Sequence, residues 1–224
     1  MKKQLFLLIL SLPFLSFSQY FNQGNDTEFG VTIGTTMFLP KTNFISTKPG
    51  IGFMIGETTR SFISDHVNLN YGISYFQHYT KLLGRENYLA EPEELKFKIA
   101  TLNVPVSVDY LFLLAERFQL GVNGGVSLSF FHEFESVDTT KEDYLIDPIS
   151  LTVRDLALRK DLEKLDINTY FSLGTSIQND YFRLELSYHN TLSKPYKNVP
   201  LRNDILIPSG SDNFFLLSLS YYFY

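Results

Sequence analysis

The sequence predicts an all-β protein, specifically an eight-stranded antiparallel up-and-down transmembrane β-barrel with short periplasmic turns and long extracellular loops. Three observations predict this fold class. The 224 residues include 14 Tyr and 21 Phe, and aromatic residues favour strands over helices. Apolar and small polar residues alternate in stretches of about ten, the length of a tilted membrane-crossing strand. The polar positions of this alternation hold glycines, amides and hydroxyls, which suit the narrow interior of a barrel.

Composition and charge limit the remaining classes. The length is that of a single domain, and the absence of cysteine excludes a disulfide framework, a thiolate metal site and a cysteine nucleophile. The net charge of -5 comes without a basic stripe, so nucleic acid is excluded as a partner.

The first segment, residues 1–18, is predicted to be a cleaved signal peptide. It has Lys2 and Lys3, then an apolar run broken at Pro13, and a small-residue ending before Gln19. The alternative is a membrane-anchoring helix, but the run is shorter than the roughly 20 residues that a span needs. The predicted organisation is a signal peptide (1–18), a short periplasmic N-terminal segment (19–26) and an outer-membrane β-barrel (27–224).

Eight stretches with the alternating pattern follow the signal peptide. The predicted strands are residues 28–39, 50–60, 66–79, 98–111, 117–131, 166–178, 181–190 and 213–224. The connections at 61–65, 112–116 and 179–180 are short, whereas those at 40–49, 80–97, 132–165 and 191–212 are long. Because long and short connections alternate, one end of the barrel is expected to carry loops and the other end tight turns.

The direction of the apolar face separates a membrane barrel from a soluble one. Along the third strand Leu69, Tyr71 and Ile73 alternate with Asn68 and Asn70, and the fifth strand follows the same rule. A face turned to water usually carries Lys, Glu and Arg, and here the Lys and Glu residues are instead concentrated in the connections. The apolar face is therefore predicted to point outward into lipid. A soluble, lipocalin-like ligand-binding barrel remains as the less favoured alternative.

A proline lies in the middle of the fourth predicted strand. Because proline cannot donate to a ladder, Pro105 requires a local bulge or a widened strand pair. The surrounding segment Thr101–Tyr110 resembles a characteristic strand of the PorT-like outer-membrane β-barrel family of Bacteroidetes, and Leu120–Gly125 resembles that family's next strand. The resemblance implies an outer-membrane barrel, and the family's namesake is linked to protein secretion across the outer membrane.

The last predicted strand ends on aromatic residues. Tyr221, Phe223 and Tyr224 resemble the C-terminal signal by which outer-membrane barrels are recognised by the barrel assembly machinery. Two registers are open, because Tyr221 and Phe223 share the better lipid face whereas the final residue, Tyr224, falls on the other one.

Charged residues on the predicted inward face form the candidate site. They are Glu28, Asp109, Arg183, Glu185 and His189. These groups could provide a proton or ion path or an active site. We favour a network of ion pairs inside the barrel, because buried charges are normally paired.

The third long connection is rich in acidic residues, and residues 155–165 have leucines at helical spacing that could lie over the barrel mouth. The acidic spacing fits neither a zinc nor a calcium motif, so a solvated loop is favoured. No G-x-S-x-G motif is present. We therefore expect no catalytic residue, no metal and no cofactor.

Two functions remain open. The favoured one is a non-catalytic integral outer-membrane barrel whose loops bind a protein partner or serve secretion or envelope integrity. The alternative is a small transport barrel that passes a solute. Bulky inward residues such as Phe76, Phe131 and Tyr170 would fill an eight-stranded interior, which favours the first. The other expected partners are outer-membrane lipid and the barrel assembly machinery.

Overall fold

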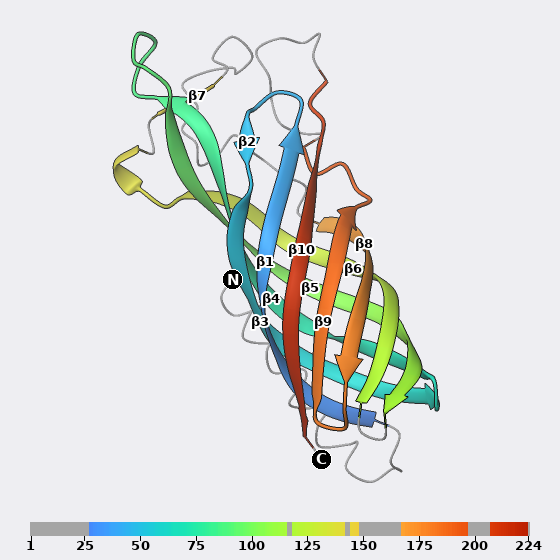
Figure 1. Ribbon diagram of the computed structural model, residues 1–224. Helices are drawn as coiled ribbons and strands as arrows, with labels where there is room; N and C mark the ends of the chain where they lie inside the picture. The colour runs from blue at the N-terminus through green and yellow to red at the C-terminus, as the bar shows by residue number, and fades with distance from the viewer. Residues whose placement is uncertain (1–26, 116–117, 142–143, 148–166, 197–206, 224) are drawn as a thin grey trace, which may run out of the picture.

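The computed structural model describes residues 27–115, 118–141, 144–147, 167–196 and 207–223 (Figure 1). The predicted signal peptide and the segment 19–26 lie outside these residues. The long strands are β1 (Thr27–Thr42), β3 (Gly50–Ser64), β4 (Val67–Arg85), β5 (Glu93–Ala115), β6 (Phe118–Ser136), β8 (Ile167–Gln178), β9 (Phe182–Thr191) and β10 (Gly210–Phe223). The short elements are β2 (Thr47–Lys48), the 3-10 helix η1 (Thr139–Lys141) and β7 (Leu145–Ile146).

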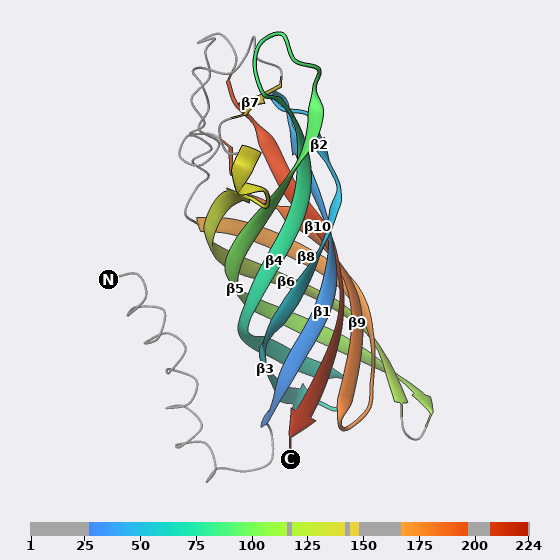
Figure 2. The same ribbon diagram turned by 90° about the vertical axis from the view of Figure 1, so that its left-hand side faces the viewer.

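The long strands form a closed barrel. Each one pairs antiparallel with the next, and β10 returns to pair with β1 from Phe29–Phe223 to Thr42–Gly210. Figures 1 and 2 show the strands tilted around a common axis, and the predicted fold class is confirmed. No helix in the described ranges is long and apolar enough to cross a bilayer.

Side chains alternate between an apolar outer face and a small, polar interior, as predicted. On β6, Val122, Val126 and Leu128 are exposed, whereas Asn123 and Ser127 are buried. The exposure of the side chains on β10 answers the open question about the face of the last strand. The exposed set on β10 is Phe215, Leu217, Leu219, Tyr221 and Phe223, and the residues between them point inward. Tyr224 lies outside the described residues.

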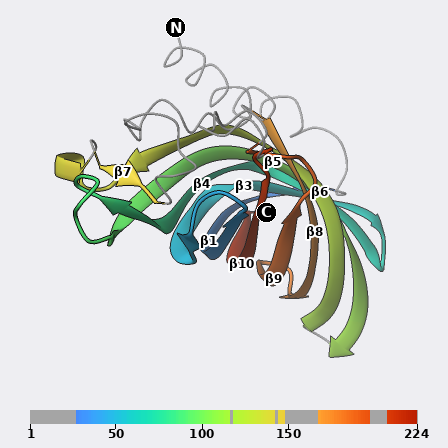
Figure 3. The same cartoon turned by 90° about the horizontal axis from the view of Figure 1, so that it is seen from above.

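The structure corrects the prediction that residues 80–97 form a long loop. The strands β4 and β5 continue beyond the barrel as a hairpin, and only residues 86–92 connect them. On its other edge β4 pairs with β2 and then with β7. Figure 3 shows the hairpin and β7 on the same side of the barrel.

A small hydrophobic core explains why the hairpin extends so far. Leu82, Leu95 and Phe97 are buried together with Phe44 and Ile146, which come from two other connections. This packing stabilises a strand pair in a segment whose charged residues had indicated a loop. We call the end of the barrel with this hairpin the loop end, and the opposite end the turn end.

Pro105 is accommodated by a widened pair between β4 and β5. Their ladder joins Tyr71 to Val106 and Ser74 to Asn103 in the same register, and it is interrupted between these two pairs. On the other side of β5, Pro105 pairs with Ser127 of β6 without a register shift at that position. The barrel wall is therefore continuous between β5 and β6, whereas the ladder between β4 and β5 lacks the pairs beside Pro105.

Candidate functional site

The interior of the barrel is narrow because eight strands enclose it. Where inward positions of neighbouring strands lie close together, they hold mainly small residues. At Gly174, an added Cβ atom would lie 2.7 Å from Asn123 Oδ1 and 2.7 Å from the backbone oxygen of Leu186. The barrel is therefore filled by its own atoms at this level.

A buried ion cluster lies in the interior and joins three strands. Arg183 of β9 donates from Nε and Nη2 to the carboxylate of Asp109 of β5, over 3.0 and 2.9 Å, and it also pairs with Glu185. Asn70 of β4 donates a further hydrogen bond of 3.0 Å to Asp109. Arg183 is 4% exposed and Asp109 is fully buried. This arrangement compensates much of the cost of burying these charges.

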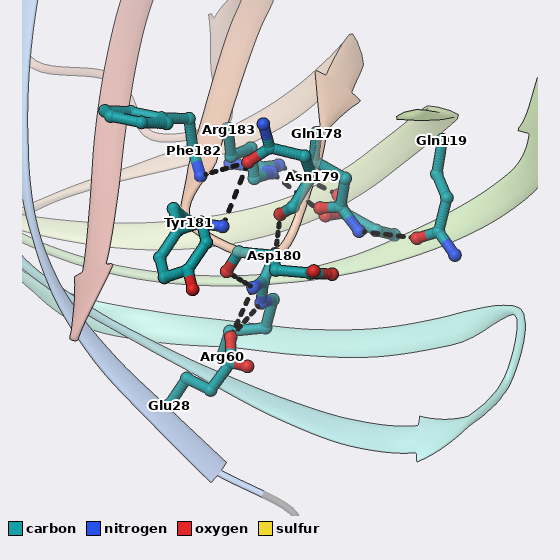
Figure 4. A network of polar contacts seen from close by, with 10 residues as sticks. Glu28, Arg60, Gln119, Gln178, Asn179, Asp180, Tyr181, Phe182 and Arg183 are labelled. Atoms are coloured by element: carbon teal, nitrogen blue, oxygen red, sulfur yellow. Dashed lines mark hydrogen bonds and ion pairs between the residues drawn. The ribbon is translucent and has the colours of Figure 1, made fainter. Parts of the chain in front are cut away.

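A second ion pair closes the turn end of the barrel (Figure 4). Arg60 of β3 pairs with Glu28 of β1 and donates 2.8 Å from its Nε atom to that carboxylate. It also donates to the backbone oxygen of Asp180, 2.9 Å away in the turn between β8 and β9. Its guanidinium lies 4.0 Å from the ring centre of Tyr222. Arg60 therefore ties three distant segments together across this mouth.

The sequence-predicted residues thus divide into two groups. Asp109, Arg183 and Glu185 lie together, whereas Glu28 belongs to the pair at the turn end. The Nε2 atom of His189 lies 3.1 Å from Ser187 Oγ on the same strand. The sequence analysis did not include Arg60, although its inward parity with Thr58 on the predicted second strand could have identified it.

Stacked rings close the interior toward the loop end. His78 lies between Phe38 and Phe76, with ring centres 4.7 and 5.4 Å away. Phe214 stacks on His189 at 4.3 Å and contacts Tyr170 at 5.4 Å. Phe76 and Tyr170 are buried, as predicted, whereas the side chain of Phe131 lies outside the described part. These rings form an aromatic layer above the ion cluster.

A small cavity of about 70 Å³ lies between the ion pair at the turn end and the aromatic layer. Its lining includes Asn70, Ser74, Asn103, Arg183, Glu185 and His189. The volume is enough for several water molecules. Among the described residues, Asn103 Oδ1 and His189 Nδ1 are buried without a protein partner, so water in this cavity would satisfy such atoms.

The described part of the third long connection is held by ion pairs and hydrogen bonds. Lys141 lies 2.6 Å from Glu93, and this hydrogen bond raises the pKa of Lys141. Hydrogen bonds from Thr140 lower the pKa of Asp138. No group of three metal-ligating side chains occurs in the described ranges. The predicted helix at 155–165 lies outside them.

The β4–β5 hairpin ends in a structured tip at residues 86–92. Asn87 Oδ1 accepts a hydrogen bond of 3.0 Å from the backbone nitrogen of Leu89. Arg85 donates to the backbone oxygen of Ala90 over 3.2 Å and to both carboxylate oxygens of Asp147 over 2.9 Å. Leu89 is 97% exposed and Tyr88 is 60% exposed. Two large apolar side chains are therefore held out in solvent by a hydrogen-bonded turn.

Comparisons with known proteins place the chain among outer-membrane barrels. Residues 17–194 match a family model described as "Outer membrane protein beta-barrel domain". Neisserial surface protein A is similar at 11% identity and a TM-score of 0.47, covering 89% of this chain and 100% of that one. The outer membrane protein OprG from Pseudomonas aeruginosa is similar at 13% identity and a TM-score of 0.46, covering 90% and 97%.

Another similar structure is an enzyme. The outer membrane protease OmpT from Escherichia coli has 8% identity and a TM-score of 0.38, covering 89% of this chain and 97% of that one. No curated protein matches the chain.

The ion cluster leads to a prediction about stability. Replacing Arg183 with Met leaves Asp109 and Glu185 buried without their cation, so we expect a loss of about 3–5 kcal/mol in the free energy of unfolding. The matched control is Lys98→Met, because Lys98 and its partner Glu135 are 39% and 51% exposed and such surface pairs contribute at most about 1 kcal/mol. Urea unfolding in lipid vesicles measures both variants. Equal losses would contradict the cluster as an interior anchor.

Proposed function

The chain belongs to the outer membrane protein beta-barrel domain family, and from this premise we propose that it is a closed, non-catalytic anchor that presents a protein-binding hairpin outside the cell. The observation that carries the proposal is the contrast between the two parts of the molecule. An ion pair at the turn end and stacked rings toward the loop end occupy the interior, whereas the hairpin holds exposed apolar side chains in a defined turn.

The closed interior argues against the alternative of solute transport. A solute would have to displace the pair of Arg60 and Glu28 at the turn end and the rings around His78 at the loop end. Between them the cavity of about 70 Å³ accepts little more than water. The barrel therefore serves as a support in the membrane.

The interior also lacks the geometry of a hydrolase. Ser187 Oγ and His189 Nε2 lie 3.1 Å apart, the spacing of a nucleophile and its base. A triad additionally needs an acid on the other ring nitrogen, and His189 Nδ1 has no partner among the described residues. Ser187 is buried in the barrel. The pair is best explained as a local hydrogen bond between inward side chains.

Charge at the hairpin tip indicates the chemistry of the partner. Glu93 pairs with Lys141, and Glu94 pairs with both Lys48 and Lys81. Glu86 and Glu91 lie on either side of Tyr88 and Leu89 in the sequence. Neither forms an ion pair with a cation among the described residues. A protein surface with an apolar depression and basic residues around it would complement this tip.

The remaining details of the proposal concern export and kinship. Residues 1–18 would act as a cleaved signal peptide, and Tyr221, Phe223 and Tyr224 would be recognised during barrel assembly. The loop end would face outside and the turn end the periplasm, as in other barrels of this architecture. The resemblance of Thr101–Tyr110 supports kinship with PorT-like barrels, which makes an accessory role in secretion a specific form of the proposed binding function.

The transport alternative can be tested by conductance. Purified protein in planar lipid bilayers should give no stable ohmic step, because both ends of the interior are closed by side chains. A variant with Arg60→Ser and Glu28→Ser serves as a comparison that opens the turn end alone, and the aromatic layer should keep it closed. A reproducible, porin-like step from the unmodified protein would favour transport over binding.

The binding function can be tested by cross-linking from the tip. A photoreactive residue in place of Tyr88 should form a discrete adduct with a partner on intact cells. Leu89→Asp should reduce this adduct about tenfold, the effect of removing about 1.4 kcal/mol from an interface. A photoreactive residue at Val137, exposed at the same end but outside the tip, is the matched control. Equal adducts from both positions, unchanged by Leu89→Asp, would count against the tip.

A further inference from the structure

The wall of the barrel has a gap beside Pro105. The strands β4 and β5 form no pairs between residues 72–73 of β4 and residues 104–105 of β5. Gly72 has no side chain to cover the gap, and Pro105 has no N–H group to donate across it. Both residues have inward parity but are partly exposed, whereas the inward residues two positions before and after Gly72 are buried. The interior is therefore accessible from the side at this point.

The cavity between the turn-end ion pair and the aromatic layer reaches the outer face of the wall at this gap. Glu57 of β3 lies two positions after the exposed Ile55, and Tyr71 of β4 is itself 37% exposed, so both belong to the outer face. Both nevertheless line the cavity, as does the exposed Val106. From the interior, the lining includes Asn70, Asn103, Arg183 and Glu185. The cavity is therefore a side pocket that opens between β4 and β5.

Negative charge is in excess around this side pocket. Among the described residues, Arg183 is the only Arg or Lys in its lining, and it is already bound to Asp109 and Glu185. Glu57 adds a third carboxyl group, which forms no hydrogen bond or ion pair with the described residues. One guanidinium group therefore serves three carboxyl groups, and charge that is left uncompensated away from water is costly.

The side pocket also contains oxygen acceptors that lack a donor. Asn103 is 2% exposed and Asn70 is 5% exposed, and the Oδ1 atom of each is buried without a partner among the described residues. Because Asn70 donates from Nδ2 to Asp109, its Oδ1 atom is the free end of the amide. Water would satisfy these oxygens but would leave the excess charge, whereas a cation with N–H donors would meet both needs.

We propose that this side pocket binds the ammonium head group of a membrane amphiphile. A primary ammonium group has three N–H donors, which match the carboxyl group of Glu57 and the two amide oxygens of Asn70 and Asn103. The volume of about 70 Å³ holds an ammonium group but not an acyl chain, so the chain stays outside in the lipid. The head group enters through the gap beside Pro105 and passes neither end of the barrel.

The test is photo-cross-linking of the full chain in phosphatidylcholine vesicles with a dodecylamine that carries a diazirine. Phosphatidylcholine has no N–H group in its head group and does not compete. We expect saturable labelling of the β4 and β5 peptides that contain Tyr71 and Val106, mapped by mass spectrometry. Glu57→Gln should weaken the binding of the probe about tenfold, because it removes the charge from one of the three acceptors.

Glu135→Gln is the matched control, because Glu135 is an exposed carboxylate outside this pocket. It should leave labelling unchanged. Asn103→Leu removes an acceptor at similar volume and should weaken binding about 2- to 10-fold, which keeps the test decisive if Glu57→Gln fails to fold. Heat-modifiable migration on gels verifies that each variant is folded. A diazirine-bearing dodecanol has the same chain with a neutral head group and should give no saturable labelling.

Competition identifies the source of the ammonium group. Phosphatidylethanolamine added to the vesicles should reduce labelling, whereas methylammonium in the buffer should not. Equal labelling by the amine and the alcohol, or labelling that neither Glu57→Gln nor Asn103→Leu reduces, overturns the proposal. Competition by methylammonium as strong as that by phosphatidylethanolamine also overturns it, because the ligand would then be a small water-soluble amine.

Discussion

The requirement that every backbone polar group be paired within the hydrocarbon governs the rest of the structure. Lipid offers no donor or acceptor, so a sheet in the membrane must close on itself. Closure is achieved where β10 returns to β1, from Phe29–Phe223 to Thr42–Gly210. Once this register is set, the two-residue period of the strands places apolar side chains toward lipid and small polar ones inside. The apolar outer face and the polar interior therefore follow from the closure of the barrel.

Closure with eight strands also determines what the interior can do. The space is so narrow that buried charges meet one another rather than a solute, as Arg183 meets Asp109 and Glu185. The same geometry brings Arg60 to Glu28 at the turn end. A filled interior leaves the surface as the place for function. At the loop end that surface includes the hydrogen-bonded tip of the β4–β5 hairpin.

The sequence was sufficient for those features that depend on local alternation. The eight long strands, the outward and inward faces of β6 and the alternation of turns with loops could all be predicted, because each is encoded within a single segment. The extension of β4 and β5 could not, since it depends on Phe44 and Ile146 packing against the hairpin from other connections. The same holds for β2 and β7, which are too short to produce a pattern.

The candidate site was predictable only in part for the same reason. Inward parity placed Asp109, Arg183 and Glu185 in one interior, but parity carries no information on which charges meet across the barrel. Which charged residues meet depends on the register between the strands, and the register of β1 and β3 pairs Glu28 with Arg60 instead.

The seam between β1 and β10 offers the most direct test of the central claim that the barrel is closed. Thr32 and Ser220 are paired across it, and their side-chain oxygens lie 3.1 Å apart although 188 positions separate them in the chain. Because the chain has no cysteine, a disulfide between cysteines at these two positions is detected without background. The closed barrel predicts near-complete cross-linking in membranes for this pair and much less for Thr32→Cys with Ser218→Cys. Absent cross-linking for the first pair, or a preference for the second, would contradict the closure and its register.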